Sequence, residues 1–554
     1  MTGTALASTW GLRTTSPELA ERYRANGWWT DESLGRVLDR GLRAHRELAF
    51  TFRSTERPWF GTFGEIADRA SRVAGGLRGV GVGPGDVLAF QTPNWMEGAV
   101  TFYAGALLGA VVVPIVHIYG ARELRYILRQ TRVRTLIIAS RFGGMDFLAN
   151  LASVGGDADA LEQVFVVGAD TAATGAVLPA SGWHRFEELS EAEPVDGPAE
   201  VSADDPVLVG YTSGTTADPK GVIHSHNTAL AETRQLISRM PLDTCPPLMA
   251  APIGHAIGML GGLLTPVLAG RPAHLMDHWD PAEVLATMAA EQLSVSGGVP
   301  YYLLSLLDHP DCTPAHHALI PAMGMGGAPV PSAVSDRAAG LGIALQRAYG
   351  STEHPSITGS GPDDPVDKRA HTDGRALPGN ELRLADPAGR PVPVGQPGEI
   401  ISRGPDLCIG FTEPALLDAA FDADGWYHTG DIGVLDDDGY LTIVDRLKDV
   451  IIRGGENVSA LEVEEVLLSL PGVTEVAVVA APDARLGEHG CAFLRLAPGA
   501  SPPALDDLRN HLERAGLARP KWPEELRVVD DLPRTPSGKV KKFVLRDQLR
   551  DQAT

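Results

Sequence analysis

A run of small residues after a short apolar segment constrains this chain more than any other feature. Val207–Val209 predicts a buried strand, and five glycine or hydroxyl residues follow at 212–216, with Lys220 and Gly221 shortly after. Small residues let a ligand approach the backbone, whose N–H groups can surround a multiply charged anion, and a lysine adds a positive charge. The stretch predicts a phosphate-binding loop after a strand, although Gly-Lys-Ser/Thr of the Walker form is missing. By itself the loop leaves a flexible connector open as the alternative.

The composition narrows the class of protein. The chain has 554 residues, which at about 150 residues per domain predicts three or four folding units. Its formal net charge is −23, and a chain this acidic repels polyanions, so we expect no nucleic-acid partner. Residues 1–29 lack the pattern of a signal peptide. Four cysteines without metal or disulfide spacing fit a reducing cytoplasm, namely Cys245, Cys312, Cys408 and Cys491.

Two long uncharged stretches raise the question of a membrane segment. Residues 99–121 contain no Asp, Glu, Lys or Arg and are long enough to span a bilayer, but glycine and proline interrupt them. Asn94 followed by Glu97 predicts a helix N-cap with its capping-box partner, and Gly109 predicts the end of that helix. A helix and a strand of an α/β core explain the stretch better than a membrane span, and the same holds for residues 248–270. We therefore expect no transmembrane segment.

Apolar segments alternate between strand and helix patterns from Thr30 to Ala203. Such alternation implies βαβ units and parallel sheets covered by helices on both faces. Residues 157–200 are rich in Ala, Gly, Asp and Glu, and we interpret them as a surface connection with one strand at 163–167. The other expected elements are strands at 86–91, 111–114 and 135–139 and helices at 95–108 and 126–130.

Three glycine-containing segments follow apolar runs further along the chain, at 297–301, 326–329 and 348–353. Glycine after a strand permits a tight turn and close approach of a ligand, and the ligand crevice of an open α/β sheet lies at the carboxyl ends of its strands. Any one segment is explained as an ordinary strand-to-helix turn. Together with the 212–221 loop they suggest one shared crevice.

Several side chains in and after these segments suit a nucleotide. Tyr349 offers a ring on which a purine can stack, Thr352 a hydroxyl, and Glu353 a hard oxygen ligand for Mg²⁺ held by ATP phosphates. The carboxylate of Asp431 can accept two hydrogen bonds from a ribose diol, as an acidic residue does in dinucleotide folds. The Asp-Arg-Leu-Lys-Asp run at 445–449 would usually be a solvated turn, but its closeness to Asp431 favours a functional role.

Beyond residue 448 the pattern changes to a compact α+β unit of about 100 residues, a normal domain size. Ser459 with Glu462 predicts a capping box that opens a helix. A basic segment at 533–542, which on an acidic protein is usually a solvated patch, follows near the end of the chain. The remaining expected elements are strands at 450–452, 476–480 and 491–496 and a helix at 504–514.

The order of these motifs resembles the adenylate-forming superfamily of acyl-CoA synthetases, luciferases and peptide-synthetase adenylation domains. The family's loop reads Thr-Ser-Gly-Thr-Thr-Gly-x-Pro-Lys-Gly, and the departure here is Ala217, where glycine or serine is usual. The family's C-terminal Pro-x-Thr-x-Ser-Gly-Lys is matched by the segment that ends at Lys539. The resemblance extends from about Thr30 to Arg546 and includes six motifs in the family's order.

The resemblance implies a role for each matching residue. It makes Lys539, Thr352, Glu353 and His255 catalytic, with Glu353 as the Mg²⁺ ligand and Lys539 reaching the α-phosphate and the carboxylate. It places the acyl pocket at His255, Gly298, Val299 and Gly326, although a lone histidine in apolar surroundings is more often structural. It makes Lys448 a hinge and Gly455 part of the CoA tunnel. The residues that it assigns to ATP or AMP are Thr212, Ser213, Gly214, Thr215, Thr216, Lys220, Gly327, Ala328, Pro329, Tyr349, Gly350, Asp431 and Arg446.

The resemblance also implies the fold and the reaction. We expect a large N-terminal α/β domain with parallel-rich sheets at 1–445 and a small mobile α+β domain at 446–554. A carboxylate would attack the α-phosphorus of Mg·ATP to give acyl-AMP and pyrophosphate, and the thiol of CoA would then displace AMP after rotation of the small domain. AMP is a good leaving group, so no side-chain nucleophile is needed, which agrees with the absence of a Ser-His-Asp or Cys-His signature.

The sequence constrains the identity of the carboxylic acid less than it constrains the type of reaction. The expected pocket residues supply no charged partner for an ammonium group, so we favour a hydrophobic acid, fatty or alicyclic. The loop variant is similar to that of cyclohexanecarboxylate- and fatty-acid-CoA ligases. Transfer to a separate carrier protein, a non-catalytic acyl-AMP-binding protein and a luciferase-like oxygenase remain alternatives, and a homodimer is possible.

Overall fold

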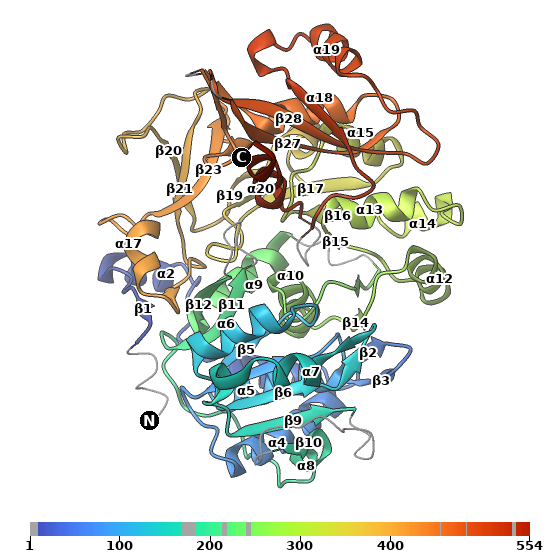
Figure 1. Ribbon diagram of the computed structural model, residues 1–554. Helices are drawn as coiled ribbons and strands as arrows, with labels where there is room; N and C mark the ends of the chain where they lie inside the picture. Colours follow the sequence, from blue (N-terminus) through green and yellow to red (C-terminus); the bar gives the residue numbers. More distant parts are fainter. Residues whose placement is uncertain are drawn as a thin grey trace.

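The computed structural model describes residues 9–168, 183–212, 219–239, 245–454, 456–483, 485–534 and 539–553. Figure 1 shows a large part that holds the N-terminal and middle elements and a smaller part, in orange-red to dark red, formed by the end of the chain. The large part is α/β and the smaller part is α+β. The expected fold class is therefore confirmed.

A nine-stranded sheet forms the centre of the large part. Its six strands from β11 (Pro206–Thr212) to β10 (Trp183–Arg185) are parallel, because each neighbouring pair runs in the same direction. The three strands β12, β22 and β1 extend it as antiparallel neighbours. The order is β1 (Gly11–Leu12), β22 (Gly410–Phe411), β12 (Lys220–Ser225), β11 (Pro206–Thr212), β5 (Val111–Pro114), β4 (Val87–Gln91), β6 (Thr135–Ala139), β9 (Gln163–Val167) and β10 (Trp183–Arg185).

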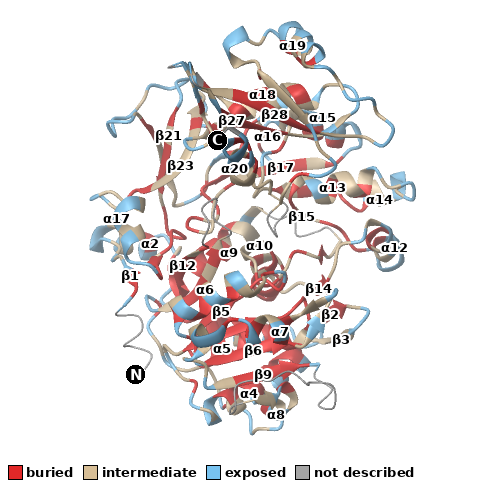
Figure 2. Ribbon diagram, viewed as in Figure 1, coloured by how far each residue is buried: buried red, intermediate tan, exposed pale blue. Residues whose placement is uncertain are grey.

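The strands at the middle of this sheet are almost wholly buried, as the red ribbon in Figure 2 shows. Such continuous apolar strands are expected where helices cover both faces of a parallel sheet. The helices of the large part are α2 (Pro17–Ala25), α3 (Leu34–Ala44), α4 (Phe63–Gly79), α5 (Met96–Leu107), α6 (Ala121–Thr131), α7 (Phe147–Ala152), α8 (Phe186–Ser190), α9 (His226–Arg239), α10 (Ala256–Met259), α11 (Thr265–Ala269), α12 (Pro281–Glu291), α13 (Pro300–Leu307), α14 (Pro314–Ala318), α15 (Ser332–Gly340), α16 (Val366–His371) and α17 (Ala415–Ala420).

The uncharged stretch at 99–121 is the buried helix α5 followed by strand β5. Gly109, with a φ of +65°, follows the helix end as expected. The predicted cap is wrong, because Trp95 is the N-cap and no side chain caps the helix. Asn94 instead donates to the carbonyls of Ala251 and Met276, which ties the helix start to a loop and to the end of a strand. No helix in the described ranges has the length and apolar character that a membrane crossing needs.

The interpretation of residues 157–200 as a surface connection is wrong in part. Besides β9, this region contains β10 and α8, whose Phe186 and Leu189 are buried in the main core. Both elements are short, so their pattern of apolar residues covers too few positions to stand out from the surrounding acidic residues.

Two smaller sheets complete the parallel framework. One has the order β13 (Leu248–Met249), β14 (Ala273–Met276), β2 (Ala49–Arg53) and β3 (Trp59–Thr62). The other carries the three expected glycine turns at the ends of its parallel strands β15, β16 and β17. Its order is β15 (Gly297–Gly298), β16 (Ala322–Met325), β17 (Ala344–Tyr349), β18 (Thr358–Gly359) and β19 (Arg375–Ala376), of which the last two are antiparallel.

A fully antiparallel sheet precedes the C-terminal part and was not expected from the strand–helix alternation. Its order is β20 (Glu381–Ala385), β21 (Gly398–Arg403), β23 (Tyr427–Leu435) and β24 (Leu441–Arg446). The next sheet begins at Ile451, so the change of sheet falls between residues 446 and 451.

The C-terminal part has its own apolar core between a sheet and its helices. The helix that opens this core is capped by Ser459, which accepts a hydrogen bond from the N–H of Glu462 at 3.1 Å. The carboxylate of Glu462 binds Lys521 instead of closing the expected box. The elements are β25 (Ile451–Arg453), β26 (Glu456–Val458), α18 (Ala460–Leu468), β27 (Val473–Asp483), β28 (Gly487–Leu496), α19 (Leu505–Arg514), β29 (Glu525–Val528) and α20 (Lys542–Ala553).

Candidate functional site

The turns at the ends of β15, β16 and β17 lie together. A Cβ atom at Gly326 would stand 3.0 Å from the carbonyl oxygen of Ala348, on the next strand. Gly327 has a φ of +77°, and a Cβ there would lie 3.4 Å from Ile257 and 3.9 Å from Val299. The turn after β16 is therefore in contact with the start of α10, next to His255, and with the end of β15.

The nine-stranded sheet reaches the same place through β11. A Cβ atom at Gly210 would lie 3.1 Å from Cγ2 of Thr352, so the strand before the phosphate-binding loop touches the turn after β17. Thr212 and Lys220 face each other as the last pair of the β11–β12 ladder. Ser213, Gly214, Thr215 and Thr216, which the sequence assigns to this loop, lie outside the described residues, and so does Gly455.

The turn that carries Thr352 and Glu353 is fixed from several sides. Gly350 has no room for a side chain, because a Cβ there would collide with the carbonyl of Pro355. The carbonyl of Thr352 contacts Nε2 of His224 at 2.8 Å, and the carbonyl of Glu353 accepts a hydrogen bond from the N–H of Cys408 at 2.8 Å. The side chain of Glu353 is thus held in a buried position at the end of β17.

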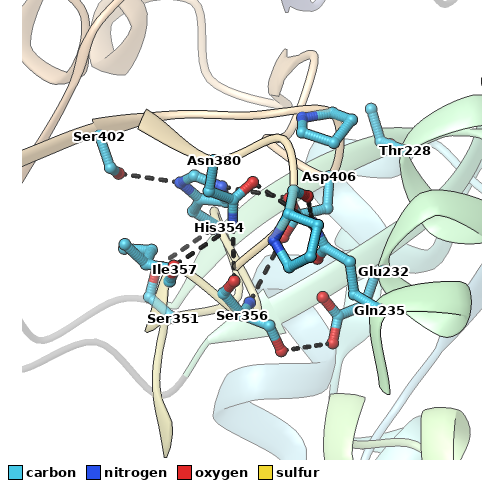
Figure 3. A network of polar contacts seen from close by, with 12 residues as sticks. Thr228, Glu232, Gln235, Ser351, His354, Ser356, Ile357, Asn380, Ser402 and Asp406 are labelled. Carbon is cyan, nitrogen blue, oxygen red and sulfur yellow. Dashed lines mark hydrogen bonds and ion pairs between the residues drawn. The ribbon is translucent and has the colours of Figure 1, made fainter. Parts of the chain in front are cut away.

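A buried polar network supports this turn from behind (Figure 3). Nδ1 of His354 contacts the hydroxyl of Ser402 at 2.8 Å, and its Nε2 contacts the carboxylate of Asp406 at 3.2 Å. The hydroxyl of Ser356 donates to Oε1 of Glu232 on α9 at 2.8 Å. Burial opposes ionisation of Asp406, yet the neighbouring His354 keeps its pKa below the ordinary value. Burial and Asp406 together raise the pKa of Glu232 well above its ordinary value.

Sequence reasoning missed this network because its members come from separate segments of the chain. A histidine directly after Glu353 is the one local signal, and it does not identify a partner 52 positions away.

Three of the expected nucleotide residues form a chain of polar contacts. The hydroxyl of Tyr349 donates to Oδ2 of Asp431 at 2.8 Å, and Nε of Arg446 lies 3.1 Å from Oδ1 of the same carboxylate. Asp431 and Arg446 are paired across β23 and β24, which fixes their spacing. Burial and the charge of Asp431 raise the pKa of Tyr349.

Lys539 brings the C-terminal part into this group. Burial lowers the pKa of Lys539 to about 8, and the charge of Arg446 contributes to this shift, whereas Asp431 and Glu353 act in the opposite direction. Burial also lowers the pKa of His255 to about 4, with a contribution from the charge of Lys539. The charge of Lys539 thus acts on four residues to which the family resemblance assigns a role, namely His255, Glu353, Asp431 and Arg446.

One hydrogen bond and one electrostatic effect further relate the C-terminal part to the large part. The hydroxyl of Ser332 at the start of α15 donates to the carboxylate of Glu465 in α18 at 2.7 Å. Between β24 and β25, burial lowers the pKa of Lys448 to about 8, and the charges of Arg446 and Lys220 contribute.

Ala328 and Pro329 follow Gly327 in the loop before α15, where Pro329 is exposed.

Comparisons with known proteins agree with this arrangement. The family described as AMP-binding enzyme matches residues 44–412, and the AMP-binding enzyme C-terminal domain matches residues 462–539. Medium-chain fatty-acid–CoA ligase of Escherichia coli (strain K12) is 33% identical over 537 residues, which cover 96% of this chain and 93% of the relative.

A second relative and a solved structure extend these matches. The 3-[(3aS,4S,7aS)-7a-methyl-1,5-dioxo-octahydro-1H-inden-4-yl]propanoyl:CoA ligase of Rhodococcus jostii (strain RHA1) is 37% identical over 494 residues, covering 88% of this chain and 93% of the relative. The crystal structure of ATP-bound MatB from Rhodopseudomonas palustris superposes with a TM-score of 0.82 at 27% identity, covering 94% of this chain and 100% of the other.

Proposed function

Because the chain belongs to the family of AMP-binding enzymes and is an AMP-forming acid–thiol ligase, we propose that the residues around Lys539 carry out its first half-reaction. In that step a carboxylate attacks the α-phosphorus of ATP, the bond to the β-phosphate oxygen breaks, and acyl-AMP and pyrophosphate form. In the second step the thiol of CoA attacks the acyl carbonyl and AMP leaves.

The observation that carries the proposal is the half-buried position of Lys539, on whose pKa the charges of Arg446, Asp431 and Glu353 act. Two anions must meet in the first step, so positive charge placed before the reaction lowers the barrier. With a pKa of about 8, Lys539 is mostly protonated at neutral pH and can supply that charge. Lys220 and the loop that precedes it would contribute further positive charge and N–H donors.

The group formed by Tyr349, Asp431 and Arg446 would hold the nucleoside. The Tyr349 hydroxyl and the Arg446 guanidinium fix the carboxylate of Asp431, which would then accept hydrogen bonds from the ribose hydroxyls. The ring of Tyr349 would stack on the adenine. Gly327, Ala328, Pro329 and Gly350 would form the backbone wall beside it.

The residues present fit a magnesium ion that arrives with ATP. Glu353 offers a hard carboxylate oxygen close to Lys539, and no group of three or more metal-binding side chains occurs in the described part of the chain. Mg²⁺ is commonly bound by one or two carboxylates together with substrate phosphates, rather than by a full protein cage. Bound there, the ion would neutralise phosphate charge.

For the second step Lys539 has to leave, since it occupies the place where the thiol must approach. We propose that residues 446–554 rotate as one domain about Lys448, which lies between the last strand of one sheet and the first strand of the next. Gly455 would then line the path of CoA.

We also propose a cytoplasmic location, because all four cysteines are free thiols.

The acid would bind beside His255, Gly298, Val299 and Gly326, and the neutral state of His255 suits an apolar group. The two relatives are named for different acids, one for a fatty acid and one for a fused-ring diketo acid, so a hydrophobic skeleton is what they share.

A panel of carboxylic acids with ATP and Mg²⁺, each run with and without CoA, tests the proposal. Pyrophosphate release and a thioester that forms only with CoA are the expected results. Acyl-AMP that accumulates regardless of CoA would identify another acceptor, such as a carrier protein. Absence of pyrophosphate with every acid would contradict the proposed half-reaction.

A further inference from the structure

Helix α9 presents a row of buried polar side chains toward the turn after β17. Glu232, Gln235 and Arg239 are spaced at i, i+3 and i+7, which places them on one face of the helix. Glu232 and Gln235 are 2% and 5% exposed. Within the described ranges, Oε2 of Glu232, Oε1 of Gln235, and Nε and Nη1 of Arg239 are buried without a hydrogen-bond partner. Buried polar atoms in native proteins are usually paired, so the two unpaired N–H groups of Arg239 indicate a missing acceptor.

The first two side chains have partners for their other polar atoms. Oε1 of Glu232 accepts from Ser356, and Nε2 of Gln235 donates to the carbonyl of Pro378 at 3.0 Å. These bonds anchor both side chains to the protein, and Figure 3 shows the bond between Glu232 and Ser356. Arg239 differs because it brings a full positive charge.

No carboxylate in the described part of the chain forms an ion pair with Arg239. The acidic residues whose charges act on the pKa of Arg239 are Glu232 and Asp364. Burial and the neighbouring Asp406 raise the pKa of Glu232 well above its ordinary value, which disfavours the charged form, and Glu232 forms no ion pair with Arg239 in the described part of the chain. Asp364 already binds the hydroxyl of Tyr440 at 2.6 Å and Arg375 at 3.1 Å. A buried charge without a partner is costly, and an incoming acceptor would relieve that cost.

The guanidinium lies over the sheet that carries the expected acyl site. A Cβ atom at Gly359 would collide with Nη1 of Arg239. Gly359 is directly opposite Ala348 in the antiparallel β17–β18 pair, so both residues face the same side. The Cβ of Ala348 lies 3.8 Å from the Cβ position of Gly326. Gly326, Ala348 and Gly359 therefore form a floor of small residues across three strands, and Arg239 stands at its far end.

Two strand spacings separate Gly326 from Gly359, which is about 10 Å. A substrate that extends along this floor from the reacting carboxylate would meet Arg239 with its distal end. The pocket residues expected from the sequence include no charged side chain, whereas Arg239 supplies one.

We propose that Arg239 binds an acceptor oxygen at the distal end of the acid, so that the preferred substrates carry a second carboxylate or a ketone far from the reacting carboxylate. This inference rests on the proposed function, because it names the substrate class of the same site. A guanidinium binds such oxygens through charge-assisted hydrogen bonds, and a carboxylate can accept two of them.

The test compares acids of equal length that differ only at the far end. A homologous series of dicarboxylic and terminal keto acids is assayed for pyrophosphate release beside the matching methyl-ended acids. For the best chain length we expect the oxygenated acid to have a kcat/KM roughly 10- to 100-fold above that of its methyl-ended partner. Comparing kcat/KM between the dicarboxylic acids and the terminal keto acids shows whether a carboxylate or a ketone oxygen is preferred.

The variant Arg239→Met should remove that preference, lowering kcat/KM for the oxygenated acid by a similar factor while the methyl-ended acid keeps or improves its rate. Arg239→Lys should retain part of it. Arg234→Met is the matched control, since Arg234 is on the same helix but binds Thr30 and the carbonyl of Trp28.

Each outcome separates this inference from the proposed function. Ligation of methyl-ended acids without any preference for oxygenated ones would overturn the role of Arg239 and leave the ligase intact. An equal fall of kcat/KM for both kinds of acid in Arg239→Met would also overturn it. So would an Arg239→Met variant that fails to fold, if the wild type has the same kcat/KM for oxygenated and methyl-ended acids. No pyrophosphate from any acid would overturn the proposed function itself.

Discussion

The hydroxyl of Tyr349 donates a hydrogen bond of 2.8 Å to Oδ2 of Asp431, a residue 82 positions further along the chain. The bond joins the end of a parallel strand to a strand of the antiparallel sheet. Arg446 holds the other oxygen of the same carboxylate. The orientation of Asp431 therefore depends on both neighbours.

Replacing Tyr349 with Phe keeps the ring and removes the hydrogen bond. We expect the KM for ATP to rise about three- to tenfold with a smaller change in kcat, because the bond orients a group that binds nucleotide in both ground and transition states. Steady-state kinetics of pyrophosphate release measures this. Tyr440→Phe also removes a tyrosine–aspartate bond, but one outside the site, and should leave the KM for ATP unchanged. An equal rise in both variants would contradict the prediction.

The pH dependence of the first half-reaction follows from Lys539. Since its pKa is about 8 and its protonated form supplies the charge, kcat/KM for acyl-AMP formation should be level below pH 8 and fall about tenfold per pH unit above it. The profile is measured in the absence of CoA. If this lysine is responsible, Lys539→Arg should shift the fall of kcat/KM to higher pH. A fall at the same pH in that variant would show that another group causes it.

The sequence predicted the local parts of the structure well and the distant contacts poorly. β5, β6 and β9 occur at their expected residues, because a run of apolar residues between turns depends on neighbours in the chain. Tyr349, Asp431, Arg446 and Lys539 were found one by one through short motifs. Their contacts with one another needed the structure.

The features that the sequence did not predict are contacts between residues far apart in the chain. Asn94 has the residue type of an N-cap, yet tertiary contacts use its amide elsewhere. Arg239 has the pattern of an ordinary charge near the end of a helix. Only the position of Gly359 beneath it reveals that the guanidinium is placed over the sheet.

Replacing His354 with Ala should destabilise the protein and weaken its catalysis together. The change leaves Asp406 buried beside Glu232 without its hydrogen-bonding partner, at a cost of about 3–5 kcal/mol. We expect a lower melting temperature in thermal unfolding and a reduced kcat, because the turn with Glu353 loses its support. His278→Ala is the control, since His278 also bridges two carboxylates but is partly exposed. Equal effects of both variants would show that burial of the network is unimportant.

Replacing Lys448 with Pro should affect the second half-reaction. Proline fixes φ and removes the backbone N–H, so the segment between β24 and β25 would lose the freedom that a rotation needs. We expect acyl-AMP formation to continue while thioester formation from acyl-AMP falls steeply. Single-turnover assays of each half separate the two. A normal thioester yield would exclude Lys448 as the hinge.

Replacing Lys539 with Ala should have the opposite effect. The variant removes the buried positive charge beside Glu353 and Asp431, so acyl-AMP formation should fall roughly 100-fold or more. Thioester formation from supplied acyl-AMP and CoA should persist, since that step requires the lysine to be absent from the site. Lys541→Ala, two positions along the same segment, is the control and should retain both activities. Equal loss of the two half-reactions in Lys539→Ala would contradict the separation of roles, because a lysine used in only one orientation of the domain cannot slow both steps alike.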